Sequence, residues 1–211
     1  MENQCCCGGS SKDAWRNKRD EWLSLKLLNI FQLLGFQKRI AFHYGCLGDL
    51  YLNQKEYEKA EKMFSNALEI NQKSNNKEQI ARNYFCLGGV YLCLMNFDKA
   101  EEANLKAIEI YKELEAKHFL DGAFFNLGVI YKQKGHLGKA EEMFLKCIDT
   151  RKDKGEKVGI YLQLEQLYEA KNDKEKAKEY LQKAVDILKN KGPKELVEKI
   201  QKKIDNLSNE K

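Results

Sequence analysis

The sequence predicts an all-α protein built from repeated helix hairpins. The chain of 211 residues contains a single proline, the residue that helix interiors tolerate least. Its 33% charged and 43% hydrophobic residues supply both a solvated surface and a buried core. One pattern of an aromatic residue, Leu, Gly and Tyr recurs every 40 residues, from Gly48 to Gly88 to Gly128. A period of this length is typical of a stacked supersecondary unit.

Four segments align on this pattern, which continues after the tyrosine with Ala, a large residue and a small residue. The fourth segment follows after 37 residues and has Glu165 in place of glycine. The aligned residues are Tyr44, Leu47, Gly48, Tyr51, Ala60, Phe64 and Ala67; Tyr84, Leu87, Gly88, Tyr91, Ala100, Asn104 and Ala107; Phe124, Leu127, Gly128, Tyr131, Ala140, Phe144 and Cys147; and Tyr161, Leu164, Glu165, Tyr168, Ala177, Leu181 and Ala184.

This pattern resembles the tetratricopeptide (TPR) motif over about residues 38 to 190. The 40-residue period and the missing closing proline are similar to the longer TPR arrays of G-protein-signalling modulators and kinesin light chains. The resemblance implies a right-handed superhelical solenoid of helix hairpins with helical caps at both ends. Within each hairpin, we expect a glycine such as Gly48 to let two antiparallel helices approach, and an alanine such as Ala60 to receive that contact.

The expected units follow one another along the chain. They are a disordered Cys-rich tail (1–13), an N-terminal capping helix (14–36), TPR 1 (38–76), TPR 2 (77–116), TPR 3 (117–156), TPR 4 (157–191) and a C-terminal capping helix (194–208).

Both terminal helices allow a second reading. The first could lie on a membrane as an amphipathic helix, with Arg16, Lys18, Arg19 and Lys26 near the lipid headgroups. The last follows the Gly192-Pro193 break and has apolar residues on one side, so it could instead pair with another chain.

Cys5, Cys6 and Cys7 stand together at the N-terminal end. They could be a tail without a role, sites of S-palmitoylation, metal ligands or redox sensors; Glu2 excludes myristoylation. The remaining cysteines lie within helical patterns, where we expect free thiols.

No enzyme motif is present. His43, His118 and His136 fall in different repeats, and the sequence contains no phosphate-binding glycine loop, HExxH or GxSxG. We therefore expect no catalytic residue, no cofactor and no metal site. The net charge of +5 comes from interspersed signs, which does not indicate nucleic-acid binding. Without a signal peptide or a membrane-spanning run of apolar residues, the expected location is the cytoplasm.

The TPR resemblance implies that the first helix of each hairpin lines a concave, partner-binding groove. The predicted groove residues are Phe42, Asp49, Leu52, Arg82, Phe85, Leu92, Phe125, Val129, Lys132, Leu162, Gln166 and Glu169, with Gly45, Gly89, Gly122 and Gly159 on the same face.

The aromatic residues of this set could bind a ligand or pack between repeats. Because lysine and asparagine are missing at the matching places, a chaperone carboxylate clamp is not expected. The sequence predicts a non-enzymatic adaptor that binds a peptide or helix of a partner protein. A membrane-tethered adaptor, acylated at the N-terminal cysteines, and an enzyme with an unfamiliar site are the alternatives.

Overall fold

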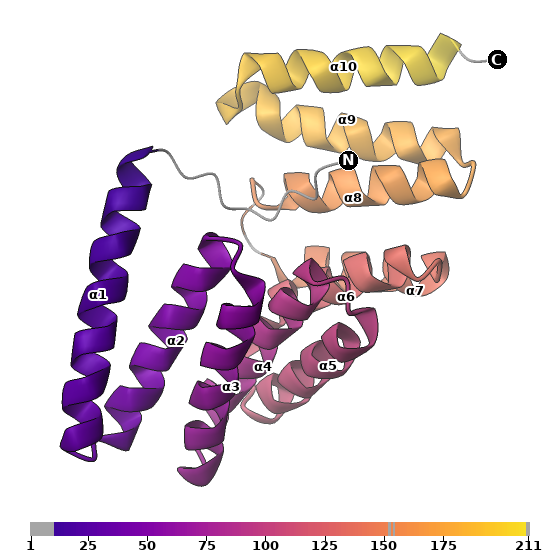
Figure 1. Ribbon diagram of the computed structural model, residues 1–211. Coiled ribbons are helices and arrows are strands. Elements are labelled where there is room, and N and C mark those ends of the chain that lie inside the picture. The colour runs from indigo at the N-terminus through magenta and orange to yellow at the C-terminus, as the bar shows by residue number, and fades with distance from the viewer. Residues whose placement is uncertain (1–10, 152, 154, 210–211) are drawn as a thin grey trace. The chain divides into compact units, whose positions relative to one another are not determined.

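The computed structural model describes residues 11–209 except 152 and 154 (Figure 1). These residues form ten α-helices and one short 3₁₀ helix, without a strand among them. Cys5, Cys6 and Cys7 lie outside the described residues. The helices are α1 (Ser11–Leu33), α2 (Gln37–Asn53), α3 (Tyr57–Lys73), α4 (Lys77–Cys93), α5 (Phe97–Glu113), η1 (Lys117–Phe119), α6 (Leu120–Gln133), α7 (Leu137–Thr150), α8 (Lys157–Ala170), α9 (Lys174–Lys191) and α10 (Lys194–Asn209).

The chain divides into an N-terminal unit, residues 1–115, and a C-terminal unit, residues 116–211. In the N-terminal unit, α2 packs on α3 and α4 packs on α5, so that each pair forms a hairpin. α3 also packs on α4, and α1 packs on α2 (Figure 1). In the C-terminal unit, α6 with α7 and α8 with α9 form the hairpins, and α10 packs on α9.

Each helix of the N-terminal unit ends in the same kind of turn. A residue with positive φ follows the helix: Gly35, Lys55, Asn75, Met95 and Glu115. In the α2–α3 turn, the backbone N–H of Lys55 donates to the carbonyl of Leu52 and that of Glu56 donates to the carbonyl of Tyr51. These bonds pair carbonyl groups that the helix end would otherwise leave without donors, which is how a left-handed residue terminates a helix.

The pattern glycines allow close contact between the two helices of a hairpin, and a large side chain of the second helix lies nearest to each of them. A Cβ atom added to Gly48 would lie 2.6 Å from the ring of Phe64, and one added to Gly128 would lie 2.5 Å from the ring of Phe144. Both rings are fully buried. The atoms nearest to these glycines thus belong to the large pattern residue four positions beyond the alanine, which the sequence expectation did not include.

Within the N-terminal unit, a hydrogen bond links the first helix of each hairpin to the second helix before it. The hydroxyl of Tyr51 donates to Glu21 over 2.8 Å, and the hydroxyl of Tyr91 donates to Glu61 over 2.9 Å. Since Glu21 stands 40 residues before Glu61, α1 takes the place of the second helix of a preceding hairpin. Leu28 is buried in the same core cluster as Leu47, and this contact fixes α1 on α2.

The fourth repeat accommodates a carboxylate where the others have glycine. Glu165 is 2% exposed. Its Oε1 forms an ion pair with Nζ of Lys203 in α10, over 2.5 Å. The geometry of this contact is not that of a hydrogen bond. Burial raises the pKa of Glu165, although Lys203 opposes the shift. Leu181 of α9 and Ile200 of α10 belong to one buried cluster. α10 is therefore held on the C-terminal unit by apolar contacts and by the ion pair of Lys203.

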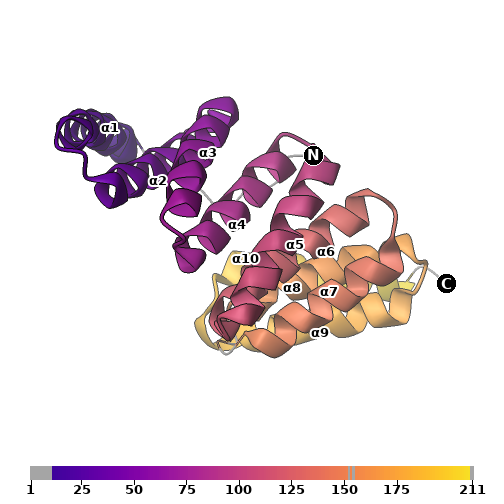
Figure 2. The ribbon, with the colours of Figure 1, turned by 90° about the horizontal axis from the view of Figure 1, so that it is seen from below.

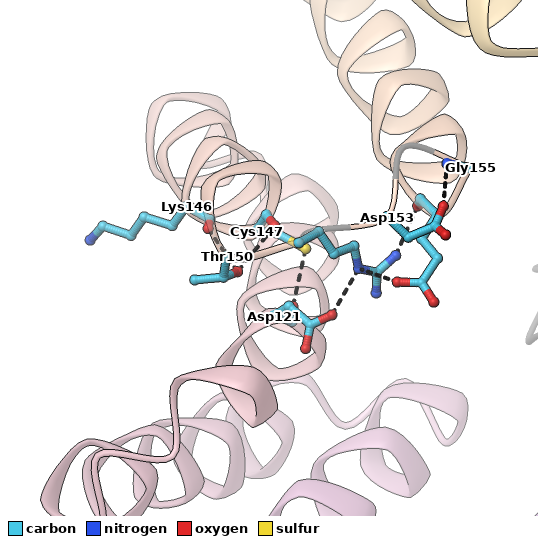
Figure 3. Close-up of polar contacts among 8 residues, drawn as sticks. Asp121, Lys146, Cys147, Thr150, Asp153 and Gly155 are labelled. Carbon is cyan, nitrogen blue, oxygen red and sulfur yellow. Dashed lines mark hydrogen bonds and ion pairs between the residues drawn. The ribbon is translucent and has the colours of Figure 1, made fainter.

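Arg151, the residue after α7, forms an ion pair with Asp121 of α6, which Figure 3 labels. Its Nε donates to Oδ2 of Asp121 over 2.8 Å, and Nη1 donates to the carbonyl of Glu156 over 2.9 Å. The thiol of Cys147 donates to the backbone carbonyl of the same Asp121. Only about a fifth of the Arg151 and Asp121 side chains is exposed, so this ion pair is better shielded from solvent than a typical surface pair.

Candidate partner-binding surface

The first helices of the two hairpins in the N-terminal unit present one surface. We call the predicted groove positions on α2 and α4 the N-terminal face: Phe42, Gly45, Asp49, Leu52, Arg82, Phe85, Gly89 and Leu92. On each helix they follow a spacing that places them on one side. Asp49 and Arg82 join the two helices through an ion pair of 3.0 Å. Sequence-distant members of this face therefore lie side by side.

The apolar residues of the N-terminal face differ in exposure. Phe42 is 59% exposed, with its ring edge against His43. Phe85 and Leu92 are half-buried, and Leu52 is half-buried against the core cluster that contains Leu47. Phe42 is consequently available to a partner, whereas Leu52 contributes in part to packing.

Gly45 and Gly89 border open space. A Cβ atom at either position would have no heavy atom within 4 Å, apart from its own helix surroundings. Neither residue has a positive φ. This separates them from Gly88, where a Cβ would lie 2.2 Å from Nδ2 of Asn104. Two adjacent glycines on α4 thus have different surroundings, one closed by the hairpin and one open.

The ionisable groups of the N-terminal face show the effect of burial. Burial raises the pKa of Asp49, and the neighbouring Arg82 acts in the opposite direction. Cys86 lies outside the residues that define this face but interacts with Arg82 and Asp49. Burial raises the pKa of its thiol to about 12, so the thiol is neutral at pH 7. A neutral thiol is a poor nucleophile.

The matching positions of the C-terminal unit make many contacts within the chain. We call the predicted groove positions on α6 and α8 the C-terminal face: Gly122, Phe125, Val129, Lys132, Gly159, Leu162, Gln166 and Glu169. Nζ of Lys132 donates to Gln166 over 2.9 Å and also to Gln163, which joins α6 to α8. Burial lowers the pKa of Lys132. Val129 is half-buried on α6.

Three further residues of the C-terminal face pack against neighbouring elements. The Phe125 ring lies 5.9 Å from that of Phe144, between ring centroids. Leu162 packs against the cluster of Leu181 and Ile200. Glu169 pairs with Lys203 over 3.1 Å. These side chains therefore make contacts within the C-terminal unit. Gly159 on α8 borders open space in the manner of Gly45.

Sequence reasoning missed Gln163 and Lys203, both of which complete polar contacts of the C-terminal face. Gln163 lies outside the groove spacing. The buried Glu165 was a usable signal for Lys203, since a carboxylate in a glycine position needs a cation nearby.

The remaining candidate groups lie apart from one another. His43 stacks on Phe31, with ring centroids 5.4 Å apart, and burial together with Arg39 lowers its pKa. His118 lies against Phe119, and His136 lies near Tyr131. Among the described residues, no group of three or more His, Cys, Asp or Glu side chains could hold a metal ion. Cys46, Cys86, Cys93 and Cys147 are reduced thiols.

None of the helices in the described part of the chain is both long and apolar enough to cross a bilayer.

The stacked hairpins and their shared face define an all-α helical repeat protein of the TPR class, as the sequence predicts. The family model of the MalT-like TPR region matches residues 46–205, and the chain belongs to this family. Proteins with this fold generally serve as protein-interaction scaffolds. No curated protein sequence matches the chain.

Solved structures share the fold at low sequence identity. The chain is similar to BtubC (BKLC) from P. vanneervenii, with a TM-score of 0.75 and 18% identity over 90% of this chain and 82% of the other. It is similar to MamA, with a TM-score of 0.63 and 20% identity over 85% and 95%. Kinesin light chain TPR-like repeats from Podosopora anserina give a TM-score of 0.63 and 13% identity over 81% and 95%.

Proposed function

We propose that the chain is a non-enzymatic interaction module that binds a peptide segment of a partner protein across the N-terminal face. The observation that carries this proposal is the open space beside Gly45 and Gly89, two helix-interior glycines whose missing side chains no contact among the described residues requires.

Glycine inside a helix costs about 0.5–1 kcal/mol relative to alanine. Gly48 and Gly88 offset this cost because a larger residue would collide with the second helix of their hairpin. Gly45 and Gly89 have no such neighbour and no left-handed backbone. The close approach of a bound main chain is one arrangement that would use the missing side chains.

The surroundings of the two glycines favour a peptide with both apolar and polar groups. Phe42 offers an exposed ring, and Phe85 and Leu92 offer half-buried apolar surface. Asp49 and Arg82 neutralise one another and supply hydrogen-bonding groups at the centre. A segment anchored by one or two large apolar side chains, as an extended strand or an amphipathic helix, suits this combination.

Selection from a random displayed-peptide library tests the proposal. The intact chain should enrich peptides with spaced large apolar residues, and the selected peptides should bind Gly45→Gln and Gly89→Gln at least about tenfold more weakly. Gly138→Gln is the control, because Gly138 also borders open space but lies in the first turn of α7, off both faces. Peptides that bind all four proteins equally, or a library that yields no enrichment, would contradict the proposal.

A further inference from the structure

The turn between α1 and α2 exposes large apolar side chains. Leu33, Leu34 and Phe36 are 89%, 57% and 52% exposed, and Ile30, about one helical turn earlier, is 48% exposed. We call these four residues the α1–α2 corner. Figure 2 shows α1 and α2 side by side at one edge of the N-terminal unit. Because the turn joins the ends of these two helices, the corner forms a projecting tip.

The next turn of the same kind shows that folding does not require apolar residues here. Forty residues further on, the α3–α4 turn has Ser-Asn-Asn at residues 74–76, where the corner region has Leu-Gly-Phe at residues 34–36. The middle residue of each has a positive φ. The N–H of the third residue donates, in both turns, to the carbonyl five positions earlier over 3.0 Å. One backbone conformation is thus built once from polar and once from apolar residues.

Phe36 also leaves α2 without a capping bond. It occupies the N-cap of α2, where its side chain makes no cap hydrogen bond. At the same place before α4, the side chain of Asn76 accepts from the N–H of Gln79. Asparagine is among the preferred N-cap residues, and large apolar residues are not. The Phe36 ring does meet that of Phe31, with 6.2 Å between centroids, but half of the side chain stays exposed. Local folding therefore favours the polar turn, and the exposed apolar corner points to a ligand.

The sequence around the corner carries only positive charge. No Asp or Glu occurs between Glu21 and Asp49, the longest such run in a chain with 32 acidic residues, whereas Lys26, Lys38 and Arg39 fall within it. Lys38 and Arg39 follow the corner directly and are exposed. Neither forms an ion pair with another described residue. The tip is therefore apolar, with unpaired cations at its base.

This combination fits an anionic lipid surface better than a protein. Four side chains on a projecting tip offer far less than the roughly 800 Å² that each partner contributes to a standard protein interface. A bilayer needs no matching shape, and apolar side chains enter its headgroup boundary to about 5–10 Å. At 1.5 Å per residue, Lys38 and Arg39 lie about 3–5 Å along the chain from Phe36, which places them at the depth of the headgroups.

The backbone of the turn is also compatible with lipid contact. The N–H groups of residues 34–37 all donate to carbonyl groups within the chain, so none of these four donors needs water. We propose that the α1–α2 corner docks the chain on an anionic membrane surface. This docking requires neither peptide binding on the N-terminal face nor acylation of a cysteine.

The body of α1 is less suited to lie flat on a membrane. Leu28 marks the side of α1 that faces α2. At 100° per residue, Arg19 and Lys26 lie about 160–180° around the helix from Leu28, in the middle of the outward side. A helix lying on a membrane needs its apolar residues together and its charges at the margins. We therefore expect the end of α1, and not its length, to contact lipid.

Flotation of the full, unacylated chain with phosphatidylcholine–phosphatidylserine vesicles tests the proposal. The wild-type chain should float, and Leu34→Ser/Phe36→Asn should bind at least about tenfold more weakly. This double variant carries the residues of the α3–α4 turn, so it should keep the fold, as circular dichroism can verify. Leu105→Ser is the matched control, because Leu105 is 46% exposed on α5, away from the corner. A wild-type chain that does not float, or a double variant that floats equally well, would overturn the proposal.

The cations are tested separately. Lys38→Glu/Arg39→Gln introduces the residues that α4 has at the equivalent positions, Glu78 and Gln79. Since each cation near an anionic surface contributes about fivefold in affinity, this variant should bind phosphatidylserine-containing vesicles at least about tenfold more weakly. With phosphatidylcholine alone, it should bind as weakly as the wild-type chain. Equal binding of the two proteins to phosphatidylserine-containing vesicles would reject an anionic surface as the ligand.

Two further measurements separate lipid insertion from other contacts. Brominated lipid should quench the added fluorescence of Phe36→Trp more than that of Leu105→Trp; equal quenching would contradict insertion of the corner. Sedimentation velocity without lipid addresses a protein occupant. A dimer that Leu34→Ser/Phe36→Asn dissociates would show that a second copy covers the corner, and would overturn the assignment to lipid.

Discussion

Gly88 and Gly89 are neighbours on α4, yet replacing each by alanine should change stability in opposite directions. At Gly89 the new methyl group enters open space, and the variant gains only the higher helix propensity of alanine. The expected gain is about 0.5–1 kcal/mol in the free energy of unfolding. At Gly88 the methyl group would lie 2.2 Å from Nδ2 and 2.7 Å from Cγ of Asn104.

Asn104 cannot move away easily. It is fully buried, and its Nδ2 donates to the carbonyl of Ala100 over 2.8 Å. Overfilling a packed interior costs about 1–3 kcal/mol, which exceeds the gain in propensity. Both variants gain the same helix propensity, so we expect them to differ by about 1–3 kcal/mol, with Gly88→Ala less stable than the wild-type chain by up to about 2 kcal/mol.

Urea unfolding followed by circular dichroism measures this difference, with equal slopes verifying that the denatured states are comparable. In thermal unfolding, each kcal/mol corresponds to about 2–4 °C for a protein of this size. The double variant Gly88→Ala/Asn104→Ala should be more stable than the sum of its single variants predicts, since it removes the collision. If Gly88→Ala and Gly89→Ala unfolded at the same urea concentration, Asn104 would not limit the space at Gly88, and the proposed contact would be refuted.

Three further predictions concern Met95 in a turn, the ion pair of Arg151 with Asp121, and the buried carboxylate of Glu165. Met95 has a φ of 58° and is exposed, so Met95→Gly should stabilise the chain by about 1 kcal/mol in urea unfolding; a loss would show that its side chain matters more than its backbone. Arg151→Ala should destabilise the chain by about 1–3 kcal/mol and Asp121→Ala similarly, with the double variant no worse than either single variant; additive losses would contradict a shared ion pair. Glu165→Gln should change stability at pH 7 by less than about 1 kcal/mol, because the carboxylate is buried at a cost and Lys203 retains Glu169. A raised pKa means that the folded chain binds the Glu165 proton more tightly than the unfolded chain, so wild type should gain stability relative to Glu165→Gln as the pH falls from 7 through the folded pKa; a relative loss would contradict the burial argument.

The repeat spacing was enough to predict the hairpins, because each pattern residue has one dominant physical role. The buried side chains of Leu47, Phe64 and Leu127 are members of the pattern, and Gly48 and Gly128 lie against large rings. What the spacing could not give is the partner of each glycine. Contact between two helices depends on which side-chain rotamers fill the gap, and the sequence specifies residue types without their directions.

The predicted binding face was harder to judge for the same reason. Its spacing follows from the helix period, and the contact of Asp49 with Arg82 is consistent with one shared surface. The sequence could not separate an exposed ring from a packed one: Phe42 and Phe125 were both predicted for the groove, but Phe42 is 59% exposed whereas Phe125 lies against the buried ring of Phe144. Nor could it distinguish the open Gly89 from the closed Gly88, since that difference depends on a residue of another helix.

The open glycines also connect stability with binding. Replacing Gly45 and Gly89 together by alanine should add about 1–2 kcal/mol to the free energy of unfolding, a sizeable part of the roughly 5–15 kcal/mol of a typical domain. Since no described residue fills the space beside the two glycines, a sequence shaped only by folding would have no reason to keep glycine there. If the face binds a peptide main chain, the same double variant should be more stable and yet bind selected peptides several-fold more weakly, as isothermal titration calorimetry and urea unfolding can measure on the same sample. A variant that gains stability and keeps its affinity would remove the reason for assigning the glycines to a partner, and the exposed ring of Phe42 would then have to account for recognition without them.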